Sequence, residues 1–552
     1  MKLPRRAALL ASTVLLGLTL PATPAFAGTS PAGPDVAKPA AKTPFAKTPT
    51  TLTTAGRTPS VMKANGRTPS PMKANGKAPA TMTAAAKTPV TTKAVPAPTL
   101  ASRLAEVKTA KAINYYPSTA GWSKMWTNFD STKIDADLDK AQALGATSVR
   151  AIIFPSTFGY PTPNATYTSR LSTFVGLAAG HNMTVKFTLF DWWGSYTDVT
   201  GSTTWANAIL KPYKDDPRVI SVELQNEFDA TDTAAVAWAK KIVPAVRTAF
   251  PTMPLTFSVD GEAGAAGMAK IKAGLAATPL DYYDYHFYGN SERALAMIRQ
   301  AQSAVSPAPI VIGEVGLNTL QNTEGEQAAF LARVFEAADA AGIQAVSPWT
   351  LTDFATGAIP DSSVSKLPAQ YNYGLYRTNG VAKAAAAVVK AEWANAPLPA
   401  TLYDNGFENA AGLGPWRPFM PELGEAVKTQ SAAHTGKWSV SLSNTGKNSA
   451  GSPSYRVAPI VPVKPAQKWH GEVWAKGNAA TGASQIAVSW FDINDKWLGG
   501  TSSASLPNGT VGWTKLIVDG VAPAGSASMQ IHLKSGANTG TVWFDDVVIT
   551  AS

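Results

Sequence analysis

The chain between residues 112 and 396 alternates short apolar runs with longer amphipathic stretches. The stretches, such as KIDADLDKAQALG from Lys133 and GEQAAFLARVFEAADAAG from Gly325, place apolar residues three or four positions apart, as helices that bury one face do. Strand and helix alternating eight times predict a closed (β/α)8 barrel. The eight apolar runs are AINYY at 112–116, SVRAIIF at 148–154, TVKFTLF at 184–190, VISVEL at 219–224, LTFSV at 255–259, YYDYHFY at 282–288, PIVIGEVG at 309–316 and AVSPWTL at 345–351.

An open doubly wound sheet is the alternative arrangement of such repeats. It usually has fewer strands and a glycine-rich phosphate-binding loop after the first strand. No GxGxxG pattern follows AINYY. The barrel is therefore the favoured interpretation, and we assign it to residues 101–398.

The pattern of apolar and polar residues changes from about Leu402, where short alternating runs are separated by Gly, Ser and Asn turns. Several short strands at this spacing predict an all-β sandwich, which we assign to residues 400–552. The predicted fold class is thus α/β followed by all-β. The six runs are KWSVSLS, HGEVWAKG, QIAVSWFD, WTKLIVDG, SMQIHLK and TVWFDDVVI.

Residues 1–27 have the features of a signal peptide. Three basic residues precede an apolar run from Ala7 to Leu20, and Ala25-Phe26-Ala27 supplies the small-x-small pattern at which such peptides are cleaved. No later segment offers about 18 uninterrupted apolar residues, so we expect a secreted, soluble mature chain with no membrane span. The Arg5-Arg6 pair leaves twin-arginine export open beside the general secretory route.

Residues 28–100 are predicted to be a disordered linker. They are rich in Ala, Pro, Thr and Lys and contain a ten-residue repeat, with GRTPSVMKAN from Gly56 and GRTPSPMKAN from Gly66. Residues 1–100 carry 13 Lys and Arg against one acid, whereas the rest of the chain carries 35 bases and 36 acids. An extended spacer is the first interpretation, and a basic anchor to an acidic cell-wall polymer is the second. Nucleic acid is not an expected partner, because Phe45 is the single aromatic residue of this segment and cannot supply interleaved base stacking.

The chain contains no cysteine, which excludes disulfides, thiolate nucleophiles and cysteine-ligated metals. The candidate chemistry lies instead in two glutamates. Glu227 follows the fourth apolar run and Glu314 lies in the seventh, and active sites of (β/α)8 barrels form where the strands end. Paired carboxylates are what glycoside hydrolysis requires. Further polar or aromatic residues occupy matching positions at the strand ends: Arg150, Asp191, Trp192, Trp193, Asn226, His286, Tyr288 and Trp349.

In this combination, residues 112–396 resemble the retaining (β/α)8 glycoside hydrolases, and most closely the cellulase-like glycoside hydrolase family 5. The resemblance rests on an Asn-Glu after the fourth strand, a Glu on the seventh and four further positions. It implies that Glu227 is the acid/base and Glu314 the nucleophile. The chain departs from the family pattern at Phe228, where proline is common, and near Asp191, where histidine is common. The matching residues are Arg150, Asn226-Glu227, His286-x-Tyr288, Glu314 and Trp349.

Physical chemistry supports these roles. Arg150 and the hydroxyl of Tyr288 are placed to donate hydrogen bonds to Glu314 and keep it ionised. Asn226 is a donor for the sugar 2-hydroxyl, and Trp349 offers a flat face to a pyranose ring, which Trp192 and Trp193 would extend. Tryptophans within the helical patterns are expected in the core: Trp205, Trp238 and Trp393.

The C-terminal region resembles carbohydrate-binding modules of the family 4 and 9 type, with NGFE from Asn405 and WFDDVVI from Trp543. The resemblance suggests a structural calcium ion held by Glu408 and Asp546. We expect Trp438, Trp474 and Trp543 to fill the sandwich core. Sugar-stacking residues are then expected among Trp416, Trp490 and Trp497.

The sequence therefore predicts a monomeric, secreted, retaining endo-β-glycanase that needs no cofactor for catalysis. Its expected partner is a β-linked structural polysaccharide, with β-1,4-mannan or β-1,4-glucan favoured. Two alternatives stay open: an exo-acting β-glycosidase of the same fold, and a non-catalytic glycan-binding protein on a degenerate barrel.

Overall fold

The computed structural model describes residues 97–399, 402, 405–408, 416–420, 423–445, 453–492 and 496–551. The predicted signal peptide, and the linker as far as residue 96, lie outside this part of the chain. Within the described residues, no helix has the length and apolar character needed to cross a bilayer.

Parallel strands occupy each of the eight apolar runs. One sheet has the order β1-β2-β3-β4-β5 and a second the order β6-β7-β8-β9, with the run at 255–259 supplying both β5 and β6. The prediction of a parallel α/β unit is confirmed. The strands are β1 (Ala112–Asn114), β2 (Ser148–Ile152), β3 (Thr184–Thr188), β4 (Val219–Glu223), β5 (Leu255–Thr256), β6 (Ser258–Val259), β7 (Tyr283–Phe287), β8 (Ile310–Val315) and β9 (Val346–Pro348).

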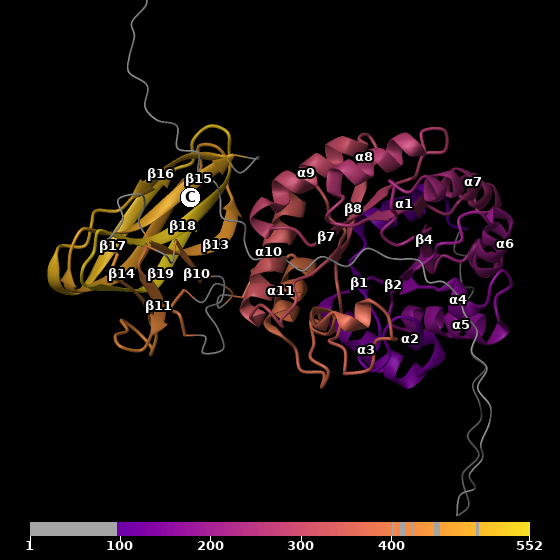
Figure 1. Ribbon diagram of the computed structural model, residues 1–552, viewed down its shortest axis with the longest axis horizontal. Coiled ribbons are helices and arrows are strands. Elements are labelled where there is room, and N and C mark those ends of the chain that lie inside the picture. Colours follow the sequence, from indigo (N-terminus) through magenta and orange to yellow (C-terminus); the bar gives the residue numbers. More distant parts are fainter. Residues whose placement is uncertain are drawn as a thin grey trace, which may run out of the picture. The chain divides into compact units, whose positions relative to one another are not determined.

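Helices lie around the outside of these strands (Figure 1). Their ends follow local sequence signals: the Asp130 side chain caps α3, and Gly145, with φ of +95°, ends it. The α-helices are α1 (Leu100–Thr109), α2 (Ser123–Thr127), α3 (Ser131–Leu144), α4 (Pro155–Phe158), α5 (Ala165–Gly180), α6 (Val199–Leu210), α7 (Thr233–Ala249), α8 (Gly264–Gly274), α9 (Ala294–Val305), α10 (Glu324–Ala340) and α11 (Ala384–Trp393). The tryptophans expected in the core, Trp205, Trp238 and Trp393, are all buried.

Helix α1 packs against the amino ends of the strands. Val107 and Ala110, at its C-terminal end, share a buried apolar cluster with Ala112 at the start of β1, Ile220 in β4 and Val311 in β8. That end of the strands is therefore filled with apolar side chains. The carboxyl ends are left to carry the polar residues predicted for the site.

The C-terminal region forms two antiparallel five-stranded sheets, which confirms the predicted all-β unit. Their orders are β10-β13-β18-β15-β16 and β11-β12-β19-β14-β17. The strands are β10 (Trp416–Phe419), β11 (Glu425–Thr429), β12 (Ser439–Ser443), β13 (Ser454–Pro462), β14 (Lys468–Ala480), β15 (Ala483–Asp492), β16 (Trp497–Ser502), β17 (Gly509–Val521), β18 (Ser526–Gly536) and β19 (Thr541–Ala551).

The tryptophans of these sheets lie largely opposite to expectation. Trp416 is 0% exposed and Trp490 is 3% exposed, and both belong to the core between the sheets, so the prediction that they stack on sugars is wrong. Trp474 and Trp543 are only half-buried, because they alternate with the inward residues of their strands. Trp474 stacks on His434, with ring centroids 4.1 Å apart, and is not a core residue. Trp438 is half-buried against the core, and Trp497 is 61% exposed, as a binding residue has to be.

Candidate active site

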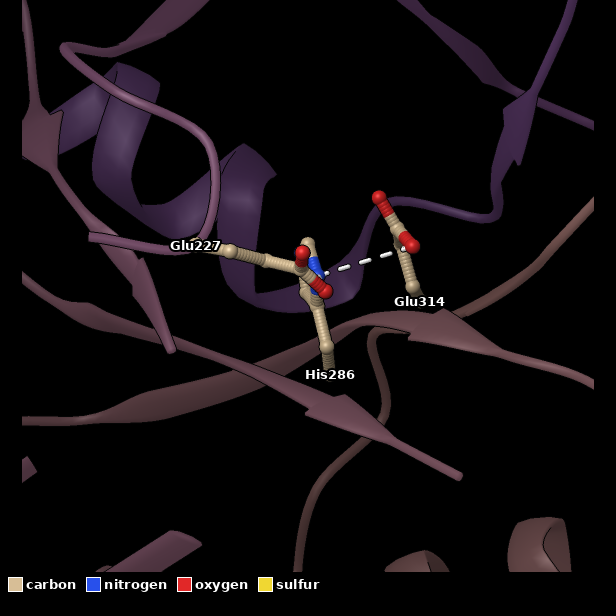
Figure 2. A group of neighbouring side chains, drawn as sticks. All are labelled: Glu227, His286 and Glu314. Atoms are coloured by element: carbon tan, nitrogen blue, oxygen red, sulfur yellow. Dashed lines mark hydrogen bonds and ion pairs between the residues drawn. The ribbon is translucent and has the colours of Figure 1, made fainter. Parts of the chain in front are cut away.

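Two carboxylates and one imidazole meet beyond the strands (Figure 2). Glu314 lies in β8, His286 in β7, and Glu227 in the turn after β4. One ligand atom of each side chain lies within 4.8 Å of the corresponding atoms of the other two. The two glutamates, 87 residues apart in sequence, therefore face each other at contact range.

The turn that carries Glu227 is anchored to β6. The backbone N–H of Glu227 donates a 2.7 Å hydrogen bond to the Ser258 hydroxyl, and the N–H of Phe228 donates to the Ser258 carbonyl at 2.9 Å. Glu227 has a positive φ of +46°, a conformation that side chains other than glycine rarely adopt. Its side chain is 32% exposed, so the carboxylate is open to a ligand.

Glu314 is held by hydrogen-bond donors on both oxygens. Nη1 of Arg150 donates to Oε1, and the hydroxyl of Tyr288 donates to Oε2 at 2.7 Å. These are the two contacts expected from the sequence. Burial, followed by the charge of Glu314, raises the pKa of Tyr288 well above its ordinary value, so the phenol stays a donor. The cation and the phenol together hold the Glu314 carboxyl group in a fixed orientation.

Arg150 is buried and uses every nitrogen of its guanidinium group. Nη1 also donates to Oδ1 of Asn114 at 3.1 Å, and Nη2 donates to Oδ1 of Asn226 at 2.8 Å. Nε donates to Glu223 at 2.9 Å. Burial lowers the pKa of Arg150, but the charges of Glu223 and Glu314 outweigh burial and raise it well above its ordinary value. The guanidinium is therefore a permanent cation with no rotational freedom.

His286 is fully buried between the two glutamates. Its Nδ1 lies 3.3 Å from Oε1 of Glu227 and 3.5 Å from Oε2 of Glu314. Burial lowers the pKa of His286, but the charge of Glu314 and the hydrogen bond with Glu227 outweigh burial and raise it. The imidazole is thus suited to donate to either carboxylate as charge moves between them.

Aromatic side chains line the neighbouring part of the structure. Trp349, which follows β9, packs edge-on against Tyr116 and Trp122, with centroids 6.2 Å and 5.8 Å away. Trp192 is 38% exposed, whereas Trp193 is half-buried against Tyr160, with centroids 4.6 Å apart. Trp192 thus offers the more accessible aromatic surface.

Asp191 is buried near this aromatic group. Tyr116 is itself buried, and burial, then the charge of Asp191, raises its pKa well above the ordinary value. Asp191 therefore lies close enough to Tyr116 for its charge to act on the phenol.

The structure adds charged residues that were not singled out in the sequence. Glu223 is 0% exposed and lies next to Arg150, while Lys186 and Asp284 form a buried ion pair that joins β3 to β7. All three interrupt strongly apolar strand runs. Charged residues are almost never fully buried unless they are paired, so this interruption was the available signal.

The three grouped ligand atoms of Glu227, His286 and Glu314 also match the spacing of a metal site. The surrounding donors argue against that use. The permanent charge of Arg150 faces one oxygen of Glu314, and the Tyr288 hydroxyl donates to the other. A cation bound here would compete with both.

The residues expected to hold calcium in the C-terminal unit lie around one loop. Oε1 of Glu408 accepts hydrogen bonds from the backbone N–H groups of Lys437 and Trp438, at 2.9 Å each. Asp546 contacts Nδ1 of His434 at 2.6 Å and accepts from the Thr435 hydroxyl at 2.7 Å. The carboxylates are near each other, but both already have partners, so calcium would have to displace some of them. The calcium site stays a prediction.

In a comparison with known proteins, the structure is similar to solved structures of glycoside hydrolases, at low sequence identity. An exo-β-1,4-mannosidase, Op5Man5, from Opitutaceae bacterium strain TAV5 has a TM-score of 0.44 and 18% identity, over 51% of this chain and 59% of that one. A GH5_18 enzyme from Streptomyces cattleya in complex with GlcNAc has a TM-score of 0.44 and 18% identity, over 53% and 83%. A GH2 β-galacturonidase from Eisenbergiella tayi bound to galacturonate has a TM-score of 0.42 and 14% identity, over 52% of each chain. No protein-family model and no curated protein matches the chain. Function is therefore inferred from the residues of the site.

Proposed function

We propose that the chain is a secreted, retaining β-glycoside hydrolase of the family 5 type that cleaves a structural polysaccharide, with β-1,4-mannan or β-1,4-glucan favoured, and acts within the polymer. The observation that carries the proposal is the contact range of Glu227 and Glu314, whose carboxylate oxygens approach within 4.8 Å. Retaining enzymes hold their carboxyl groups about 5–5.5 Å apart, and inverting enzymes about 6.5–9.5 Å apart to admit a water. A pair this close favours direct attack on the sugar.

The two glutamates differ in the way that the two roles require. Glu314 is buried beneath Arg150 and Tyr288, which keep it anionic and aimed, as a nucleophile has to be. Glu227 lies on a more exposed turn, and its Oε1 lies 3.3 Å from Nδ1 of His286, so it suits the acid/base role.

In the first step, an oxygen of Glu314 attacks the anomeric carbon. The bond from that carbon to the leaving oxygen breaks, and the leaving oxygen takes the proton of Glu227. The products are a glycosyl ester on Glu314 with inverted configuration and a free sugar hydroxyl. Asn226, fixed through Oδ1 by Arg150, directs its amide group to the sugar 2-hydroxyl.

In the second step, Glu227 removes a proton from water, and the water oxygen attacks the same carbon. The ester bond breaks, Glu314 becomes a carboxylate again and Glu227 regains its proton. Two inversions give net retention. His286 contacts both carboxylates and can donate to whichever carries more negative charge.

A closed barrel is part of the proposal and is supported at both junctions of the sheets. Between β5 and β6 only Phe257 intervenes in the chain. On the other side, the N–H of Leu351, beyond β9, donates a 3.0 Å hydrogen bond to the carbonyl of Asn114 at the end of β1.

Product stereochemistry tests the proposed function. The chain would be incubated with β-mannan, carboxymethylcellulose, xylan and β-1,3- and β-1,6-glucans, and the first anomer released would be followed by proton NMR. We expect the β-anomer and a mixture of oligosaccharides. An α-anomer would overturn retention, release of single sugars alone would indicate exo action, and binding without turnover would indicate a non-catalytic glycan-binding protein.

One variant assigns the roles. Glu314→Ala should lose nearly all activity, and azide should rescue it as a glycosyl azide of inverted configuration. Rescue of Glu314→Ala with retained configuration would reverse the two assignments.

A further inference from the structure

A carboxylate that plays no part in the steps above lies directly beneath the site. Glu223, the last residue of β4, is 0% exposed. Its Oε2 accepts hydrogen bonds from Nε of Arg150 at 2.9 Å and from the Thr188 hydroxyl at 2.5 Å, and Nη2 of Arg150 lies 2.7 Å away. An unpaired buried carboxylate would be costly, so this position is maintained only with its partners in place.

The contacts of Glu223 determine where Arg150 can direct its remaining nitrogens. Glu223 holds the Nε edge of the guanidinium, while Nη1 is directed to Glu314 and Nη2 to Asn226. Because the guanidinium is planar and rigid, fixing one edge fixes the other. The position of the nucleophile therefore depends on Glu223 through Arg150.

Glu223 also adjoins the support of the acid/base residue. The Ser258 hydroxyl accepts the backbone N–H of Glu227 at 2.7 Å, and hydrogen bonding from the same hydroxyl lowers the pKa of Glu223. Ser258 therefore has Glu223 on one side and the Glu227 turn on the other. Glu223 is therefore linked to Glu314 through Arg150 and to the Glu227 turn through Ser258.

Charged groups from three strands face Glu223. Arg150 comes from β2, Lys186 from β3 and His286 from β7, and Asp284 neutralises Lys186. Burial raises the pKa of Glu223, but Arg150, Lys186 and His286 outweigh burial and lower it to about 2. The residue is thus an anion throughout the working range of a glycosidase.

We propose that Glu223 is the positioning residue of this site, which sets the separation of Glu227 and Glu314 and shares the charge of Arg150 with the nucleophile. The inference rests on the proposed function and deepens it. Without Glu223, the full charge of Arg150 would be directed at Glu314, which would make that carboxylate a weaker nucleophile. The guanidinium would also be free to turn, and displacements of about 1 Å cost about 100-fold in rate.

The test is the isosteric variant Glu223→Gln in the full-length chain, with Asp137→Asn as the matched control. Asp137 is also a buried carboxylate paired with cations, Lys133 and Lys140, but it lies on α3, and its further contact is the Tyr115 hydroxyl at 3.1 Å. We expect both variants to lose stability. Only Glu223→Gln should lose about 10- to 100-fold in kcat with little change in KM, and only its pH–rate profile should move to lower pH.

A readout that does not need turnover separates the inference from the proposed function. The chain has five histidines, so the titration of His286 can be followed by nitrogen NMR. Loss of the Glu223 charge should shift the His286 titration to lower pH, whereas Asp137→Asn should leave it unchanged.

Each outcome is decisive. A wild-type chain that cleaves no glycan sinks the proposed function, while the histidine titration still tests Glu223. The positioning role is overturned if the wild type is active and Glu223→Gln matches Asp137→Asn in its pH–rate profile, its kcat and its His286 titration. Should Glu223→Gln fail to fold, Thr188→Val removes one donor to the same oxygen but keeps the charge, so a smaller loss of kcat without a shift of the His286 titration to lower pH is required.

Discussion

The Tyr288 hydroxyl lies 2.7 Å from Oε2 of Glu314 and donates a hydrogen bond to it. Tyr288→Phe removes this donor and leaves the ring in place. Hydrogen bonds to charged groups contribute about 1.5–3 kcal/mol, so kcat/KM should fall by about 10- to 100-fold. The control is Tyr283→Phe in β7, the strand that ends just before Tyr288; side chains five positions apart along a strand point to opposite faces. Equal losses in the two variants would contradict the proposed role.

Trp349 is expected to act as the platform for the sugar at the reactive position. Trp349→Ala removes a ring packed against Tyr116 and Trp122. Aromatic contacts contribute about 0.5–1.5 kcal/mol beyond the area they bury, so kcat/KM should fall by about 3- to 10-fold or more. Steady-state kinetics on an oligosaccharide checks this, with Trp393→Phe in α11 as the control for a general loss of packing. Unchanged kinetics for Trp349→Ala would place the sugar elsewhere.

Glu223 predicts a specific loss of stability in acid. Its pKa is lowered from an ordinary 4.5 to about 2, chiefly by Arg150 against the opposing effect of burial. A lowered carboxyl pKa stabilises the fold above the ordinary value and ceases to do so as pH falls through the lowered one. The wild type should therefore lose about 3 kcal/mol between pH 5 and 2 that Glu223→Gln does not lose. Urea unfolding at several pH values measures this, and parallel curves for the two proteins would refute it.

Calcium should stabilise the C-terminal unit if Glu408 and Asp546 bind it. At a hundredfold excess over its dissociation constant, the ion would add about 2.7 kcal/mol to the stability of that unit. Thermal melting with calcium or EDTA tests this, with Asp546→Asn as the variant and Asp519→Asn as its control. If neither calcium nor EDTA changes the melting temperature, the prediction of a calcium site is wrong.

Binding to insoluble polysaccharide should depend on Trp497, which is 61% exposed. Trp497→Ala should reduce retention on the solid without changing kinetics on soluble substrate, because a linked binding module acts by raising local concentration. Ile517→Ala, which shortens another exposed apolar side chain of the same unit, is the control. A loss of retention confined to Ile517→Ala would place the binding face on the other sheet.

The order of the elements could be predicted because each parallel strand lies in a largely apolar run. The proximity of Glu227 and Glu314 could also be predicted, since both lie near the ends of strands and parallel strands end on one side. Glu223 escaped notice for the opposite reason: it sits inside a run that otherwise predicts an apolar core. Its partners Arg150 and Lys186 come from other strands, and the sequence does not show which strand interiors face one another.

The sandwich tryptophans were misassigned although the sequence contained the signal. Trp490 is in phase with Ile486 and Val488, which are buried, whereas Trp543 is out of phase with its buried neighbours Val542 and Phe544. Alternation along each strand decides which residues face inward. Strands β10, β11, β13 and β16 were not predicted, because prolines, glycines and charged residues break their alternation.

At Glu227, the residue type that suits the left-handed backbone differs from the residue type that can donate a proton. A non-glycine residue in this region costs about 1–3 kcal/mol, and only glycine adopts a φ of +46° freely. Glycine at position 227 would therefore raise the free energy of unfolding but remove the proposed proton donor. A random-mutagenesis screen that selects for thermal stability alone should therefore enrich inactive variants at position 227. A library designed to stabilise this protein has to keep residue 227 unchanged.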